Sequence, residues 1–238
     1  STSPTVVLVN DTTVNQNSTS LVSNGTLSVN GQILTLSGAT YTVLSGGTLQ
    51  LDTSSTLRLA SGASLTVNSG GTLSTSNTTA SSRARIESSA GYVGLTINGT
   101  MNTSFLWIDD LNATGLAVGA NATLTGWRGI RFSGGENPAG PDNSRYINLT
   151  AATGSTTLPA SIEECWFEAG PDNNVLGDLA GATHPNVTFS EQRPFAYYKI
   201  ALLYVLSCQS YIIALLRLFK DLHITAIHLC IFNHHNSI

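Results

Sequence analysis

The sequence predicts an all-β fold, a parallel β-helix (solenoid), and two observations carry this prediction. Four short segments recur at a spacing of eight residues, namely Gly47–Leu51, Ser55–Leu59, Ala63–Val67 and Gly71–Thr75. Each alternates polar and apolar residues, which is typical of a strand because its successive side chains point to opposite faces. Eight residues leave no room for a crossover helix, so we expect the strands to stack as coils of a solenoid.

Three strands of eight residues make a coil of 24, so residues 47–71 are expected to form about one coil. Leu49, Leu57, Leu65 and Leu73 would then point inward, with Leu49 and Leu73 at the same corner of successive coils. Looser copies of the pattern occur at Gly25–Val29, Gln32–Leu36, Gly94–Ile97 and Gly115–Val118. A sandwich of antiparallel hairpins is the alternative, since its turns recur at similar spacing. The repeated Gly-Thr-Leu phrase favours the solenoid.

Larger side chains appear after residue 100, in Phe105–Ile108 and in Trp127–Phe132. Strict alternation in the second phrase predicts that Trp127 and Arg131 share one face, and that Arg128 and Phe132 share the other. This phrase, Trp-Arg-Gly-Ile-Arg-Phe, resembles a motif of the right-handed parallel β-helix repeat proteins of microbial surfaces.

The Gly-Thr-Leu units resemble the passenger rods of autotransporter-type adhesins, and the resemblance covers roughly residues 20–190. It implies a β-helix fold. It does not choose among adhesins, phage tailspikes and polysaccharide lyases, all of which use this fold.

A five-residue phrase occurs twice, as Ala139–Asn143 and as Ala169–Asn173. If thirty residues make one enlarged coil, these are the same turn on neighbouring coils. Pro-Asp-Asn is a favourable turn sequence, which explains the repeat without a ligand. The alternative is a weak calcium site between Asp142 and Asp172. No other cofactor or metal is expected.

Catalytic residues are not predicted anywhere in the chain. Alternation separates Arg128 from Arg131, and the adjacent pairs Asp109-Asp110 and Glu163-Glu164 should each diverge. Paired carboxyls at a fixed gap would be needed for glycoside hydrolysis, and the sequence does not place Asp109 against Glu163 or Glu164. His184 precedes a proline in an expected loop.

Composition favours an extracellular setting. Only 10% of residues are charged, and residues 1–192 contain no lysine. The net charge of −4, without any basic stripe, argues against nucleic-acid binding. Cys165 is the one cysteine before residue 193, and we expect it to be a core side chain.

Ten of nineteen asparagines begin a glycosylation sequon. Modification would make the protein a surface glycoprotein, whereas the alternative is that asparagine simply suits solenoid turns. The candidate asparagines are Asn10, Asn17, Asn24, Asn77, Asn98, Asn102, Asn112, Asn121, Asn148 and Asn186.

The chain is expected to have two parts, a parallel β-helix rod over residues 1–192 and an atypical apolar tail over residues 193–238. The tail has no glycine and holds both lysines and two of the three cysteines. Its apolar run, Ile200–Leu216, leaves three alternatives open. They are a membrane anchor, a helix that caps the solenoid, and a non-native extension from out-of-frame translation or a lost stop codon.

These observations predict an extracellular structural or adhesive solenoid that is non-enzymatic and able to form filaments. The alternative is a carbohydrate-active enzyme of the same fold, either a polysaccharide lyase or a glycoside hydrolase. Expected partners are a second copy or a surface glycan or protein, with a membrane only if residues 200–216 are an anchor. The apolar run Val6–Val9 is expected to be an edge strand that pairs with a neighbouring subunit. A flat Thr-x-Thr array, as an ice-binding surface would need, is not expected.

Overall fold

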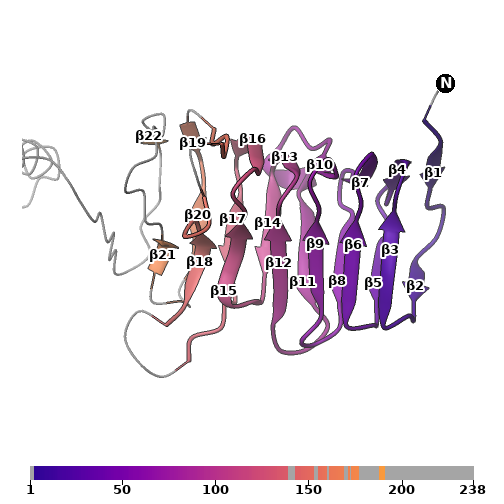
Figure 1. Cartoon of the computed structure of the whole chain (residues 1–238), viewed down its shortest axis with the longest axis horizontal. Helices are drawn as coiled ribbons and strands as arrows, with labels where there is room; N and C mark the ends of the chain where they lie inside the picture. The colour runs from indigo at the N-terminus through magenta and orange to yellow at the C-terminus, as the bar shows by residue number, and fades with distance from the viewer. Residues whose placement is uncertain are drawn as a thin grey trace, which may run out of the picture. The chain divides into compact units, whose positions relative to one another are not determined.

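The computed structural model confirms a parallel β-solenoid (Figure 1). It describes residues 3–138, 143–152, 155–159, 161–168, 171, 173–176 and 188–190. The chain divides into two compact units, Ser1–Ala201 and Leu202–Ile238. All of the second unit lies outside the described residues, so the three alternatives for the tail remain open.

Three parallel sheets form the solenoid, and the chain visits each sheet once per coil. Sheet A consists of β1 (Thr5–Val7), β4 (Gly25–Ser28), β7 (Gly47–Leu51), β10 (Thr72–Thr75), β13 (Thr100–Ser104), β16 (Thr123–Arg128), β19 (Ser161–Glu163) and β22 (Thr188–Ser190). Sheet B consists of β2 (Thr12–Val14), β5 (Ile33–Leu36), β8 (Thr56–Leu59), β11 (Ala84–Ser88), β14 (Leu106–Asp109), β17 (Arg131–Ser133) and β20 (Trp166–Phe167). Sheet C consists of β3 (Ser18–Val22), β6 (Thr40–Val43), β9 (Ser64–Val67), β12 (Val93–Ile97), β15 (Leu111–Val118), β18 (Arg145–Asn148) and β21 (Asn173–Leu176). One 3-10 turn, η1 (Ala80–Ser82), lies between β10 and β11.

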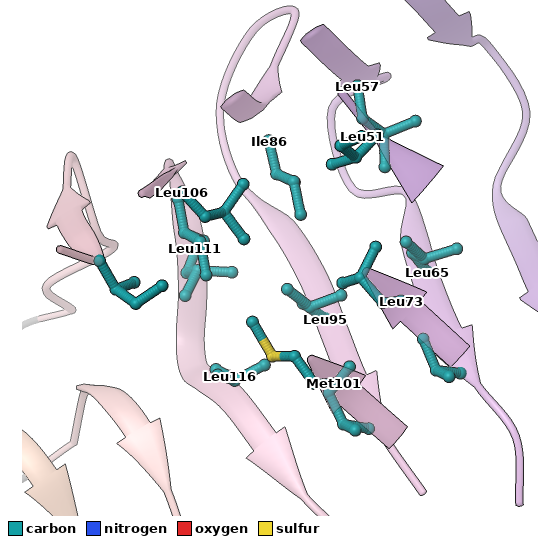
Figure 2. Close-up of a cluster of buried hydrophobic side chains, with 14 of the residues drawn as sticks. Leu51, Leu57, Leu65, Leu73, Ile86, Leu95, Met101, Leu106, Leu111 and Leu116 are labelled. Carbon is teal, nitrogen blue, oxygen red and sulfur yellow. The ribbon is translucent and has the colours of Figure 1, made fainter. Parts of the chain in front are cut away.

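The core is built from inward columns of apolar side chains (Figure 2). Leu49, Leu57, Leu65 and Leu73 are fully buried, as predicted. Leu49 pairs in register with Leu73, which confirms the predicted corner and the coil of 24 residues. The antiparallel sandwich is therefore wrong for this segment. One column per sheet runs Leu27–Leu49–Leu73–Met101–Leu124, Leu34–Leu57–Ile86–Ile108–Phe132–Phe167, and Tyr41–Leu65–Leu95–Leu116–Ile147–Val175.

Later coils are longer, and aromatic side chains fill their core. Thr72 pairs with Thr100, and Arg131 pairs with Trp166, so the coil grows beyond 24 residues where loops are inserted. Phe132 stacks on Phe167, with ring centroids 5.2 Å apart and an interplanar angle of 4°. Cys165 is buried beside this cluster, as predicted, and burial raises the pKa of its thiol to about 11.

The prediction of which side chains share a face in Trp127–Phe132 is wrong. Trp127, Ile130 and Phe132 are all buried, whereas the side chain of Arg128 is 56% exposed and that of Arg131 is 27% exposed. The alternation breaks because the phrase is not one strand. Gly129, with φ of +66°, turns the chain between β16 and β17, so the pattern restarts in a second sheet.

Both copies of the repeated five-residue phrase connect sheet B to sheet C. One follows β17 and the other follows β20, and the strands after them, β18 and β21, pair with each other. Most residues of both copies lie outside the described ranges, so the expectation that they form the same turn stays a prediction. The register of β18 with β21 pairs Asn173 with Arg145 and not with Asn143. Asp142 and Asp172 themselves lie outside the described residues, so the calcium alternative stays untested.

Candidate functional site

Charged and aromatic side chains gather on the outer face of sheet B. Alternation points two side chains outward from each of four successive strands or their ends. These pairs are Arg85 and Glu87 in β11, Trp107 and Asp109 in β14, Arg131 and Ser133 in β17, and Trp166 in β20 with Glu168 directly after it. In-register stacking aligns these pairs into two columns. We call Arg85, Trp107, Arg131 and Trp166 the aromatic column, and Glu87, Asp109, Ser133 and Glu168 the carboxylate column.

The aromatic column is held by cation–π contacts. The guanidinium carbon of Arg85 lies 4.4 Å from the ring centroid of Trp107, and that of Arg131 lies 4.0 Å from the same ring. Arg131 also lies 5.7 Å from the centroid of Trp166. Trp107 therefore has two guanidinium groups against its ring, which is the favourable arrangement for such contacts. A sugar ring that stacked on Trp107 would have to displace an arginine.

The carboxylate column is neutralised by the same arginines. Glu87 accepts from Arg58 at 2.7 Å and lies 2.8 Å from Arg85. Asp109 accepts from Arg85 at 2.5 Å and from the Ser133 hydroxyl at 2.8 Å.

Farther along the two columns, Arg131 pairs with Glu168, and the Trp107 indole N–H donates to the Ser133 Oγ at 2.5 Å. Three arginines thus face three carboxylates on this surface. The arrangement links neighbouring coils, because each of these carboxylates accepts from an arginine of the preceding coil.

Asp110, the residue after β14, is a carboxyl outside these two columns. Its backbone has φ of 58°, which turns the chain out of β14. The expected divergence of Asp109 and Asp110 is wrong, because the Oδ1 atoms of both lie 2.5 Å from the point where a side chain at Gly134 would begin. Burial raises the pKa of Asp110, and the charge of Asp109 raises it further.

The other candidate acids are not brought together. Glu164 lies at the corner that precedes β20 and accepts from Arg128 at 2.9 Å, whereas Asp109 lies at the far end of β14. Glu163 belongs to sheet A. The hydrogen bond from Arg128 lowers the pKa of Glu164, and this effect is larger than the opposing effect of burial. Glu164 is therefore a poor proton donor. His184 lies outside the described residues.

The sequon asparagines differ in accessibility. Asn10, Asn17, Asn24, Asn102 and Asn121 are exposed, and Asn98, Asn112 and Asn148 are half-buried. Asn77 is 3% exposed, and its Nδ2 lies 3.5 Å from the Phe105 carbonyl oxygen. Asn186 lies outside the described residues. The side chains of Asn112 and Asn148 accept from the backbone N–H two residues later, which is the turn role that explains them without a glycan.

Threonine forms a further column on the outer face of sheet A. It runs in register through Thr5, Thr26, Thr48, Thr72, Thr100 and Thr123. The neighbouring outward column mixes Ser28, Gln50, Ser74 and Asn102. A two-rank Thr-x-Thr array is therefore absent from this part of the sheet, as predicted.

Sequence reasoning missed the two columns of sheet B. The signal is present as residue pairs two positions apart, such as Arg85 with Glu87 and Trp107 with Asp109. Their alignment depends on register across coils of unequal length, where Arg85 pairs with Trp107 but Arg131 pairs with Trp166. The insertions between coils hide that register from the sequence.

The described part of the chain shows neither a metal-binding cluster nor a membrane-spanning helix. Among those residues no group of three or more acidic, histidine or cysteine side chains is arranged to hold a metal ion. No helix within the described ranges is long and apolar enough to span a bilayer. Residues 200–216 lie outside these ranges. Comparisons with protein-family models, curated proteins and solved structures find no significant match.

Proposed function

We propose that this chain is an extracellular structural or adhesive β-solenoid without enzymatic activity. The observation that carries the proposal is the pairing of charges on sheet B, where Arg58, Arg85 and Arg131 each contact a carboxylate. General acid–base catalysis needs an acid or base that can exchange protons with a substrate. These charges instead connect successive coils, which suits a surface that holds its shape.

The remaining outward columns support the same role. Sheet A presents hydroxyl side chains at every rung from Thr5 to Thr123, and sheet C aligns Ser20, Thr42, Thr66 and Thr96. A repeated array of hydroxyls at about 4.8 Å spacing offers many weak, identical contacts to a repetitive ligand such as a surface glycan. The small share of charged residues and the exposed sequon asparagines are consistent with an extracellular location.

The extracellular part of the proposal is tested on intact source cells. Brief protease treatment should remove the chain from the surface while a cytoplasmic marker survives, and enzymatic deglycosylation should lower its apparent mass. Protection of the chain from protease until the cells are lysed would contradict an exposed location.

A carbohydrate-active enzyme is the second candidate, and the raised pKa of Asp110 beside Asp109 favours it. The test incubates the full chain with acidic and neutral polysaccharides, with and without calcium. We expect no new reducing ends and no unsaturated products. Turnover that disappears in Asp110→Asn but persists in Glu164→Gln would replace the structural proposal with the enzyme.

A further inference from the structure

Arg83 is a half-buried arginine that forms no ion pair with any residue the structure describes. Its Nε instead donates to the Gly129 backbone oxygen at 3.1 Å. This bond uses one of the five guanidinium N–H groups and leaves the two terminal nitrogens for another acceptor. Four other arginines each contact a carboxylate, namely Arg58, Arg85, Arg128 and Arg131.

The Arg83 side chain follows the corner where the chain passes from sheet A to sheet B. Arg83 directly precedes β11, and its bond to Gly129 reaches the residue between β16 and β17, two coils farther on. Phe105, Gly129 and Glu164 occupy this corner in three successive coils, with φ of 50°, 66° and 52°. The backbone therefore turns in the same way each time, and the corner forms a regular surface along the solenoid.

The acids at this corner lie beside a different arginine. Glu164 accepts from Arg128 at 2.9 Å, and Glu163 is the register partner of Arg128 in β19. Arg128 also lies 5.8 Å from the centroid of the Phe105 ring. Its guanidinium is therefore already engaged, whereas that of Arg83 is held in place by a backbone oxygen alone.

The surroundings of Arg83 do not compensate its charge. Burial lowers the pKa of the Arg83 guanidinium and the charge of Arg131 lowers it further, and these effects outweigh the opposing effects of Cys165 and Glu164. An arginine nevertheless stays protonated at neutral pH. An oxyanion would supply the missing negative charge, because its oxygens match the fork of the two terminal nitrogens.

We propose that the corner around Arg83 is a binding site for an oxyanion, namely the sulfate or carboxylate group of an acidic glycan. Thr100 and Thr123 begin β13 and β16, the strands of sheet A that lead into this corner, so their hydroxyl column lies on the adjoining face. The choice of a glycan as carrier rests on the proposed adhesive role, whereas oxyanion binding by Arg83 does not.

Three immobilised polymers of one backbone test the site, namely dextran, dextran sulfate and carboxymethyl dextran. We expect the full chain to bind one or both of the charged polymers more tightly than dextran, and the polymer that binds identifies the anion. Arg83→Gln should raise the Kd for that polymer about tenfold, since a charge-assisted hydrogen bond is lost. Arg58→Gln is the matched control, because it removes the same charge from an arginine that is paired with Glu87. It should change the Kd by less than about twofold.

Glu164→Gln distinguishes anion binding from a purely structural role of Arg83. Removing this carboxylate takes away a competing negative charge and frees Arg128, so the Kd for the charged polymer should fall. If Arg83→Gln also lowers the urea midpoint of unfolding, this increase in affinity decides the question, and its absence overturns the site.

Two other results would also overturn the site. One is the absence of binding to both charged polymers, and the other is an equal loss of affinity in Arg83→Gln and Arg58→Gln. Binding of dextran and the charged polymers with the same Kd, unchanged in Arg83→Gln, would overturn the site and leave the adhesive role standing.

Discussion

Asp52 and Asp110 are two carboxyls whose pKa values shift in opposite directions. Burial alone would raise the pKa of Asp52, but hydrogen bonds from Ser28, Gln50, Ser76 and the Asn30 N–H lower it. Ser28 and Ser76 belong to the coils on either side, so Asp52 joins three coils. At Asp110, burial and the charge of Asp109 raise the pKa by more than the backbone hydrogen bond from Ser88 and the charge of Arg85 lower it.

Removing each charge should therefore change stability in opposite directions. Asp52→Asn should lower the free energy of unfolding at pH 7 by about 1 kcal/mol, because a partly exposed, hydrogen-bonded carboxylate is lost. Asp110→Asn should leave stability at pH 7 equal or higher. Urea titrations of both variants measure the difference, and a loss in Asp110→Asn as large as that in Asp52→Asn would contradict the pKa assignments.

The pH dependence follows from the same shifts. The contribution of Asp52 is present above its ordinary pKa of 3.8 and is lost as pH falls through its lower folded pKa. Asp110 has a raised folded pKa, so its ionisation removes stability as pH rises above 3.8. The urea midpoint of unfolding, measured at a series of pH values above 3.8, should therefore fall less with rising pH in Asp110→Asn than in the wild-type protein.

Leu57 tests the inward columns one side chain at a time. It is fully buried, and its neighbour Thr56 points outward beside Arg85. Leu57→Asp should unfold the solenoid because a buried, unpaired carboxylate costs several kcal/mol. Thr56→Asp is the matched control and should retain the fold. Equal thermal stability of Leu57→Asp and wild type would show that residue 57 does not face the core.

At the scale of elements, the outer columns of sheet B hold the longer coils in place. Trp107 bridges two coils through Arg85 and Arg131, where inserted loops separate the strands in sequence. Trp107→Ala should lower the free energy of unfolding by about 1–3 kcal/mol, since it removes two cation–π contacts and ring packing. Tyr92→Ala should change it by less than about 0.5 kcal/mol because that ring is exposed. The urea midpoint measures both, and equal effects would mean that the column does not couple coils.

Prediction from sequence succeeded where coils have equal length. Leu49 to Leu73 lie in the regular part of the chain, and alternation with an eight-residue spacing is sufficient to place them inward and in register. It failed at Trp127–Phe132, because a single glycine in a left-handed conformation divides the phrase between two sheets. The two outer columns of sheet B could not be predicted either, because a contact such as Arg85 with Trp107 depends on the register between neighbouring coils.

At the scale of the whole molecule, the solenoid should not require the tail. Within the described residues, the inward columns from Leu34 to Phe167 form one continuous core cluster, and repeat proteins gain their stability from neighbouring coils. Truncation after Ser190 should therefore leave a soluble, β-rich protein, whereas the full chain should be less soluble because Ile200–Leu216 is apolar. Circular dichroism and sedimentation measure both.

Other outcomes of the truncation would identify the tail. Aggregation of the shortened chain would mean that residues 193–238 cap the solenoid. Firm partition of the full chain into lipid vesicles, with the truncated chain left in solution, would identify Ile200–Leu216 as an anchor.

In-register stacking of coils underlies every proposal made for this molecule, and a designed disulfide tests it directly. Thr48 and Thr72 are outward register partners in β7 and β10, about 4.8 Å apart across a parallel ladder, which lies within the range a disulfide can span. In a Cys208→Ser, Cys230→Ser background, Thr48→Cys with Thr72→Cys should form an intramolecular disulfide on mild oxidation. Thr48→Cys with Ser74→Cys should not, because the second position is two residues farther along β10. Bridging of the second pair but not the first, or of neither pair, would contradict the stacked register.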